Sequence, residues 1–269
     1  TYMSKYKMIV MDMDDTLMNP DNEVSPETER YLIDIQQRGY HVVLASGRPT
    51  EGMLPVARQL KLDQYESYVI SYNGGKTIAV KDEHVEVSKS VSKENFDTIV
   101  DFCREHELFV LTYHEGFIIY EGDHEYMNIE SELTGLPMKR VEDIKAFIQS
   151  DVPKVMSVDY VPKITSLNIE LSGHFNEEVD VTTSKPFFLE FMAKDVSKGN
   201  ALTAFCEKIN INLSEVIAFG DSSNDISMLN VVGHAVAMGN ANEAVKAVAD
   251  EITLSNGDNC IPHTLAAIL

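Results

Sequence analysis

The stretch KMIVMDMDDTL, residues 7–17, decides the fold of this 269-residue chain. Its apolar residues 8–11 do not alternate with polar ones, which is typical of a strand buried in a parallel sheet. Asp12, Asp14 and Asp15 follow at the carboxyl end of this strand, where open α/β sheets bind their ligands. Asp12 and Asp14 can point to the same side, because side chains alternate along an extended segment. Two carboxylates at such a short distance repel each other unless a cation lies between them or one of them is protonated. The stretch therefore predicts a catalytic or metal site. A solvated acidic turn is the alternative for this stretch taken alone.

Composition limits the class of protein. The apolar share of 44% is ordinary for a soluble globular chain, and no apolar run approaches the ~20 residues that span a membrane. The net charge of −21 argues against binding to nucleic acid, whose phosphates it would repel. Three scattered cysteines without metal spacing favour a reducing cytoplasm, and no secretion signal is expected. We expect a monomer or a homodimer.

The order of the expected elements predicts two domains. Strands and helices alternate over residues 1–85, and the same rhythm resumes over residues 190–269. This alternation predicts an α/β core with a doubly wound parallel sheet. Residues 86–189 contain successive strands with few helices between them, which indicates an inserted α+β domain on an antiparallel sheet.

Polar side chains gather where the core strands end or the core helices begin. They are Asp12, Asp14, Ser46, Lys198, Asp221, Asn224 and Asp225. Because parallel strands bring their carboxyl ends to one edge, we expect these residues to converge. Carboxylates with open positions suit Mg²⁺, while the hydroxyl, ammonium and amide groups suit a phosphate. The alternatives are an ordinary helix cap at Ser46 and an exposed first-turn lysine at Lys198.

Four segments resemble the motifs of the haloacid dehalogenase-like phosphatases. They are Asp12-x-Asp14-x-Thr16, Ser46-Gly47-Arg48, Lys198-Gly199 and the run from Gly220 to Asp225. The insert, the Asn73-Gly74-Gly75 turn and the run from Ala237 to Ala241 are similar to the Cof-type branch with its type II cap. The resemblance covers nearly the whole chain and implies a Rossmann-like three-layer core with an inserted α+β cap. One departure is Asn259-Cys260-Ile261, where this branch usually has a Gly-Val pair.

The resemblance also implies roles for individual residues. Asp12 would be the nucleophile, and Asp14 the general acid and base. Mg²⁺ would be bound by the carboxylates of Asp12 and Asp221 and by the backbone carbonyl of Asp14. The phosphate oxygens would be held by Ser46, the N–H groups of Met13 and Gly47, Lys198 and Asn224.

Four further residues are expected to support the site. Asp225 would orient Lys198 or a metal-bound water. Arg48 would contact the substrate or the insert, or would form a structural ion pair. Thr16 and Asn73 complete this set.

The implied activity is Mg²⁺-dependent hydrolysis of small phosphorylated metabolites, such as sugar phosphates, through an aspartyl phosphate. The insert would choose the substrate and exclude water. A phosphosugar mutase on the same scaffold is one alternative. A receiver-like phospho-acceptor module is another, although the Asp-x-Asp arrangement and the additional domain argue against it.

Overall fold

The computed structural model describes residues 4–171, 174–175 and 177–269, and the chain divides into two compact units. The core unit consists of Thr1–Ser88 and Ser197–Leu269, and the inserted unit of Lys89–Val196. The sequence placed the insert at 86–189. Strand β5, Val85–Ser88, pairs with the core sheet, while β11, Phe188–Ala193, pairs within the inserted sheet. Both boundaries therefore lie further along the chain than predicted, because strand pairing and not local sequence sets them.

The core unit is built on one sheet with strand order β14-β13-β12-β1-β2-β3-β4-β5. The pairs from β14 to β3 are parallel, and β4 and β5 are antiparallel additions at one edge. Besides β5, the strands are β1 Met8–Asp12, β2 His41–Ala45, β3 Tyr68–Ser71, β4 Lys76–Ala79, β12 Val216–Gly220, β13 His234–Ala237 and β14 Glu251–Ile252. Every residue of β1 is buried, as its continuous apolar run predicts.

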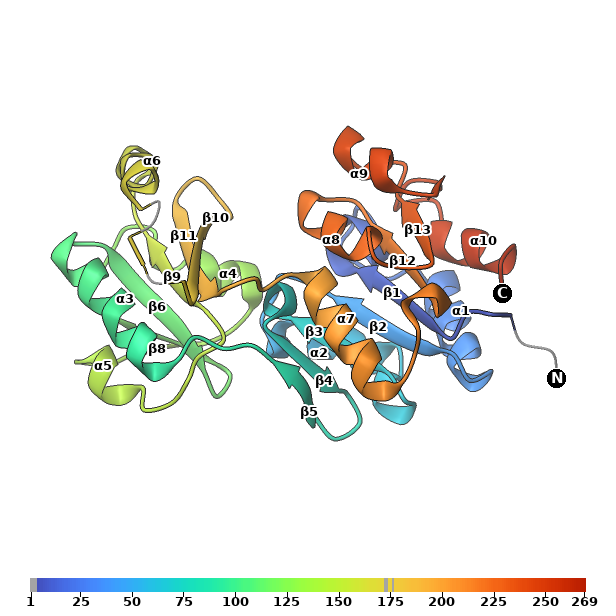
Figure 1. The fold of residues 1–269 in the computed structure, drawn as a ribbon, viewed down its shortest axis with the longest axis horizontal. Helices are drawn as coiled ribbons and strands as arrows, with labels where there is room; N and C mark the ends of the chain where they lie inside the picture. The colour runs from blue at the N-terminus through green and yellow to red at the C-terminus, as the bar shows by residue number, and fades with distance from the viewer. Residues whose placement is uncertain (1–3, 172–173, 176) are drawn as a thin grey trace. The chain divides into compact units, whose positions relative to one another are not determined.

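Helices cover both faces of the core sheet, which confirms the predicted α/β class. They are α1 Pro26–Gln37, α2 Thr50–Gln59, α7 Lys198–Ile209, α8 Ile226–Leu229, α9 Glu243–Val248 and α10 Cys260–Ala266. Helix α1 packs against α10, and α7 packs against α8, on opposite faces of the sheet (Figure 1). In the part of the chain that the structure describes, every helix is too short or too polar to cross a lipid bilayer.

The departure at Asn259-Cys260-Ile261 has a packing explanation. Asn259 takes a φ of 51°, accepts a hydrogen bond from the Ser25 hydroxyl at 2.5 Å and donates one to Glu27 at 2.8 Å. Cys260 and Ile261 are buried in the core cluster behind it. The segment connects the start of α10 to the start of α1 through these hydrogen bonds, and it is not part of the site described below.

The inserted unit is an α+β unit on its own sheet, with strand order β10-β11-β9-β6-β7-β8. Neighbouring strands are antiparallel except for β7 and β8. Besides β11, its strands are β6 Phe109–His114, β7 Phe117–Glu121, β8 Met138–Arg140, β9 Val155–Val158 and β10 Val179–Thr183. Its helices are α3 Lys93–Glu105, α4 Ile129–Thr134, α5 Ile144–Phe147 and α6 Val161–Glu170.

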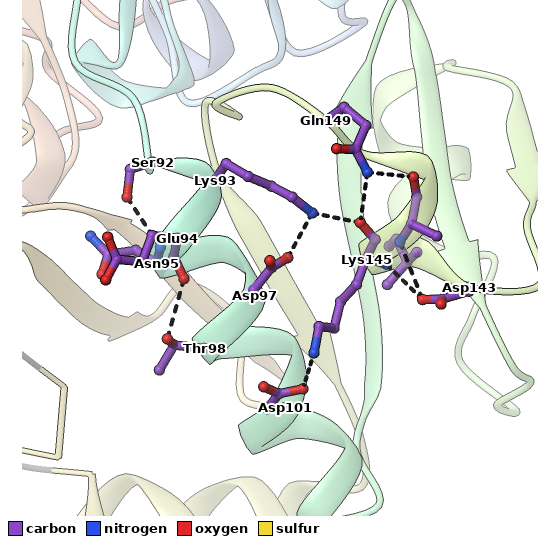
Figure 2. Close-up of polar contacts among 12 residues, drawn as sticks. Ser92, Lys93, Glu94, Asn95, Asp97, Thr98, Asp101, Asp143, Lys145 and Gln149 are labelled. Atoms are coloured by element: carbon purple, nitrogen blue, oxygen red, sulfur yellow. Dashed lines mark hydrogen bonds and ion pairs between the residues drawn. The ribbon is translucent and has the colours of Figure 1, made fainter.

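Polar contacts join α5 to α3 on the surface of the inserted unit (Figure 2). The Lys93 ammonium donates to Asp97 at 2.7 Å and to the carbonyl of Lys145 at 2.5 Å, and the Lys145 ammonium contacts Asp101 at 2.7 Å. Partly exposed ion pairs of this kind contribute little, roughly 0–1 kcal/mol each. The apolar cluster beneath them, which includes Phe96, is therefore the main stabilising contact between the two helices.

A buried polar cluster lies on the inserted sheet and was not anticipated from the sequence. The ammonium of Lys154 lies 2.6 Å from the Glu190 carboxylate and 5.3 Å from the centre of the Tyr113 ring, and Tyr113 donates to Glu130. Burial opposes the charge on Lys154, but Glu190 and Glu130 raise its pKa. Burial likewise raises the pKa of Glu130, against the influence of Lys154 and the Tyr113 hydroxyl. Pairing offsets part of the cost of removing these charges from water, and loss of one partner would leave the other charge buried without compensation.

Candidate active site

Three strand ends of the core sheet lie side by side. Asp12 closes β1 opposite Ala45 of β2, so Ser46 follows directly beside it. On the other side of β1, Met11 lies opposite Phe219 of β12, which brings Asp221 to the same edge. Parallel pairing therefore gathers residues that are far apart in the sequence, as predicted.

The two aspartates of the first motif have different surroundings. Strand β1 ends at Asp12, and residues 13–17 form a tight turn in which Asp15 has a φ of 61°. Asp12 is 6% exposed, and its carboxylate accepts the backbone N–H of Met13 at 2.8 Å. Asp14 lies within the turn and is exposed. Alternation along one strand therefore does not relate the two side chains, because the chain leaves the sheet between them.

Lys198 is a fully buried lysine between two carboxylates. Its ammonium lies 2.7 Å from Asp225 and 3.2 Å from Asp12. Burial alone would lower the pKa of Lys198, but Asp12 and Asp225 raise it. The alternative of an exposed first-turn lysine is therefore wrong. A Cβ on the next residue, Gly199, would lie 2.3 Å from the carbonyl oxygen of Ser227, so only glycine lets α7 start this close to α8.

Asp225 holds Lys198 and the start of the fourth motif together. One of its carboxylate oxygens accepts the Lys198 ammonium, and the other accepts the backbone N–H groups of Asp221 at 3.0 Å and Ser222 at 3.1 Å. Gly220 is required beside it, because a Cβ there would lie 2.6 Å from the Cβ of Asp225. This geometry suits the orienting role that the sequence assigned to Asp225.

Asp221 lies at the same edge and is held by two hydroxyl groups. Thr16 donates to one of its oxygens at 2.7 Å and Ser222 to the other at 2.8 Å. Burial raises the pKa of Asp221, and the hydrogen bond from Thr16 opposes the rise. Thr16 thus connects the first motif to the fourth.

The buried carboxylates fit a divalent cation. Asp12, Asp221 and Asp225 each offer an oxygen, and these three oxygens lie within 4.8 Å of one another. Burial raises the pKa of Asp12 well above its ordinary value even though Lys198 acts in the opposite direction. The single ammonium of Lys198 therefore does not neutralise the negative charge of the three carboxylates. A hard cation that prefers oxygen ligands would supply the missing positive charge.

The second motif lies next to Asp14. The Ser46 hydroxyl oxygen is buried and accepts the backbone N–H of Arg48 at 3.1 Å. The Arg48 guanidinium contacts both carboxylate oxygens of Asp14, at 3.1 and 2.5 Å. Of the roles considered for Arg48, the structure contains the ion pair. Gly47 is exposed, and a Cβ there would meet nothing within 4 Å, so a ligand can approach its backbone.

Asn73 joins the remaining motifs. Its backbone N–H donates to the carbonyl of Ser46 at 2.9 Å, and its side-chain oxygen accepts the Asn224 amide at 3.2 Å. The next residue, Gly74, has a φ of 113°, and a Cβ there would lie 2.2 Å from the carbonyl oxygen of Ser197. The predicted tight turn therefore packs directly against the residue that precedes Lys198.

Two residues near the site were given no role from the sequence. Ser222 donates to Asp221, and the Asn240 amide donates to the carbonyl of Asp15 at 2.9 Å. A hydroxyl directly after a strand-end aspartate is a signal that could have indicated Ser222. Asn240 belongs to the run from Ala237 to Ala241 that the resemblance singled out, but its partner is more than two hundred residues away, so its contact was not predicted.

Comparison with known proteins agrees with this geometry. The family profile described as haloacid dehalogenase-like hydrolase matches residues 9–265. A Streptococcus pyogenes serotype M6 protein with a provisional phosphatase name is 31% identical over 96% of this chain and 97% of its own. The 5-amino-6-(5-phospho-D-ribitylamino)uracil phosphatase of Bacillus subtilis is 27% identical over 93% of this chain and 90% of its own.

A solved structure shows the same likeness. The crystal structure of a haloacid dehalogenase-like hydrolase from Bacteroides thetaiotaomicron superposes with a TM-score of 0.92 at 34% identity. The match covers 98% of this chain and all of that one. These matches extend over both units and all four motifs. The chain therefore belongs to the haloacid dehalogenase-like hydrolases and, within them, to the Cof-type phosphatases.

Proposed function

We propose that this phosphatase hydrolyses small phosphorylated metabolites, sugar phosphates in particular, with Mg²⁺ and through an aspartyl phosphate on Asp12. The observation that carries the proposal is the buried cluster of Asp12, Lys198, Asp221 and Asp225 with the exposed Asp14 beside it. The three buried carboxylates, with a cation and the lysine, suit a phosphoryl group, whereas an exposed carboxyl group can reach a leaving oxygen. The Bacillus subtilis relative, named for a phosphorylated ribityl compound, supports a small metabolite as substrate.

In the first step, a carboxylate oxygen of Asp12 attacks phosphorus, and the bond from phosphorus to the ester oxygen breaks. The departing oxygen takes the proton of the Asp14 carboxyl group, so an alcohol leaves and an aspartyl phosphate remains. Lys198 lies 3.2 Å from Asp12 and places a positive charge where the phosphoryl oxygens would lie. Gly47 and Ser46 would offer an N–H and a hydroxyl to the same oxygens.

In the second step, water attacks phosphorus and gives its proton to the Asp14 carboxylate. The bond between phosphorus and the Asp12 oxygen breaks, which releases inorganic phosphate and restores both carboxyl groups to their starting state. The sum of the two steps is ester plus water giving alcohol plus phosphate. A phosphosugar mutase would pass the phosphoryl group to a sugar hydroxyl instead, and neither it nor a receiver-like module is favoured by the relatives, which are named as phosphatases.

The carboxylates of Asp12 and Asp221 and the backbone carbonyl of Asp14 would hold Mg²⁺. When bound, the ion neutralises charge on the transferring phosphoryl oxygens. Asp225 would not need to bind it directly, because one of its oxygens already pairs with the Lys198 ammonium and the other accepts two backbone N–H groups. A cytoplasmic location and a monomeric or homodimeric state stay predictions from the sequence.

Removal of divalent cations is expected to abolish phosphate release, because the under-compensated carboxylates would repel the phosphate. Asp221→Asn should weaken cation binding most, so excess Mg²⁺ should restore part of its rate. Initial rates with p-nitrophenyl phosphate, measured against MgCl₂ concentration after chelation, test both expectations. Asp21→Asn, which changes an exposed aspartate outside the cluster, is the matched control. Full activity after prolonged chelation would contradict the role of the cation.

Asp14→Asn is expected to slow the hydrolysis of alkyl phosphates much more than that of p-nitrophenyl phosphate. An alkoxide needs a proton to leave, whereas p-nitrophenolate scarcely does. Loss of general acid–base catalysis typically costs about 10²–10⁴-fold, so the contrast between the two esters should be large. Steady-state kcat for both esters measures it, and equal losses would remove Asp14 from the acid role.

A further inference from the structure

The pair formed by Arg48 and Asp14 is bidentate. The Nε atom of Arg48 donates to one carboxylate oxygen of Asp14 at 3.1 Å, and Nη2 donates to the other at 2.5 Å. The side chains are 23% and 54% exposed, so burial does not force them together. Two parallel contacts between a planar guanidinium and a carboxylate fix orientation as well as distance.

Arg48 is itself anchored on its own loop. Its backbone N–H donates to the Ser46 hydroxyl, and its carbonyl accepts the N–H of Tyr72 at 2.9 Å. A third guanidinium nitrogen, Nη1, lies 3.4 Å from the carbonyl oxygen of Gly52 at the start of α2. The guanidinium is therefore held from the second motif whether or not Asp14 contacts it.

Asp14 has no such anchor for its side chain. Its backbone belongs to the turn of residues 13–17, and in the described part of the chain the hydrogen bonds of its carboxylate are those from Arg48. An exposed aspartate without a partner samples several rotamers. The Arg48 contacts select one of them, which holds the carboxyl group at the second motif, the loop that follows β2 next to β1.

We propose that Arg48 is a positioning residue that holds the Asp14 carboxyl group in place for its two proton transfers. The inference rests on the proposed function, because it assigns no chemistry to Arg48 beyond the acid–base role of Asp14. Each carboxylate oxygen has two lone pairs and Arg48 occupies one of them, so the proton can bind at the other while both contacts keep the carboxyl group within reach. Misplacement of a catalytic group by about 1 Å can cost 10²-fold in rate.

The test is a double-mutant cycle with Arg48→Lys and Asp14→Asn, assayed on glycerol phosphate and on p-nitrophenyl phosphate. Lysine keeps the charge but cannot make two parallel contacts, so Arg48→Lys should lower kcat on glycerol phosphate about 10–100-fold with little change in KM. The aryl ester, which scarcely needs a proton, should lose only a small factor. In the Asp14→Asn background, Arg48→Lys should cause no further loss, because the group that it positions is gone.

Arg58→Lys, at an exposed arginine of α2 whose Glu83 partner is 3.9 Å away, is the matched control and should keep wild-type rates on both esters. An equal loss from Arg48→Lys with and without Asp14 would overturn the proposal, as would a rise in KM for both esters, which indicates direct binding of the substrate phosphate. A chain that no longer folds would identify the pair as a folding contact and would also overturn it. If the wild-type protein hydrolyses neither ester, the proposed function fails instead.

Discussion

Asp12→Asn is expected to abolish phosphate release, with a loss on the order of 10⁶-fold, as when a serine protease loses its nucleophile. An amide cannot attack phosphorus as a carboxylate does, and Lys198 and Asp221 would then surround a group without reactivity. The variant should also leave no covalent phosphoenzyme. Acid quenching during turnover of a ³²P-labelled ester gives the label retained on each protein, and release of that label by borohydride identifies it as an aspartyl phosphate. A trapped phosphoenzyme in the variant would place the nucleophile elsewhere.

The same substitution should stabilise the metal-free protein at neutral pH. Burial raises the pKa of Asp12 well above its ordinary value of 3.8. In the pH range between 3.8 and the raised pKa, the folded state therefore binds more protons than the unfolded state. The free energy of unfolding therefore falls as pH rises through that window, and Asp12→Asn removes this part of the fall. Thermal unfolding in chelator from pH 4.5 to 8 measures it, and a steeper decline in the variant would contradict the sign.

Lys198→Met is expected to have the largest effect on stability, because it leaves Asp12 and Asp225 buried without their shared cation. Breaking a buried ion pair by removing one partner costs about 3–5 kcal/mol. Activity should fall as well, since the positive charge beside the phosphoryl site is lost. Urea unfolding in chelator gives the change in free energy, and p-nitrophenyl phosphate hydrolysis gives the change in rate.

Added Mg²⁺ should restore part of the stability lost in Lys198→Met, since a cation bound to the same carboxylates replaces some of the missing charge. Lys208→Met is the matched control. Lys208 lies on the same helix, α7, but is 46% exposed and pairs with Glu86 at 3.1 Å, so its loss should cost little. Equal destabilisation by the two substitutions would show that burial between carboxylates has no special cost here.

Much of the core could be predicted from the sequence, because its strands are continuous apolar runs that end in chemistry-bearing residues. The apolar run of residues 216–220 forms a strand that ends before Asp221, and a helix begins at Lys198. Ser25 caps the first helix, with its hydroxyl oxygen accepting the N–H of Thr28. Local signals suffice for such elements, since hydrophobic period and capping residues act within a few positions of the chain.

Features that depend on distant partners could not be predicted in the same way. The short run of β5 indicates a hairpin with β4, which the structure contains, but the boundary of the inserted unit depends on which strands complete each sheet. The position of Asp14 depends on where β1 ends. The pairing of its carboxylate with Arg48 depends on the contact between the loop after β1 and the loop after β2. The buried contact between Lys154 and Glu190 likewise joins two strands of the inserted sheet. The spacing of residues along the sequence does not indicate these long-range contacts.

The pairing of β1 with β12 affects how the chain folds as it leaves the ribosome. Met8 lies opposite Val216, so the central strand of the core lacks one neighbour until most of the protein has been synthesised. The inserted unit, in contrast, has its whole sheet and apolar cluster encoded between residues 89 and 196, so it can finish folding before the core does. Until then the nascent chain carries an unpaired apolar strand edge, which is prone to misassembly. Asp12 is enclosed only after that edge is filled, and catalytic competence is therefore among the last properties that the growing polypeptide acquires.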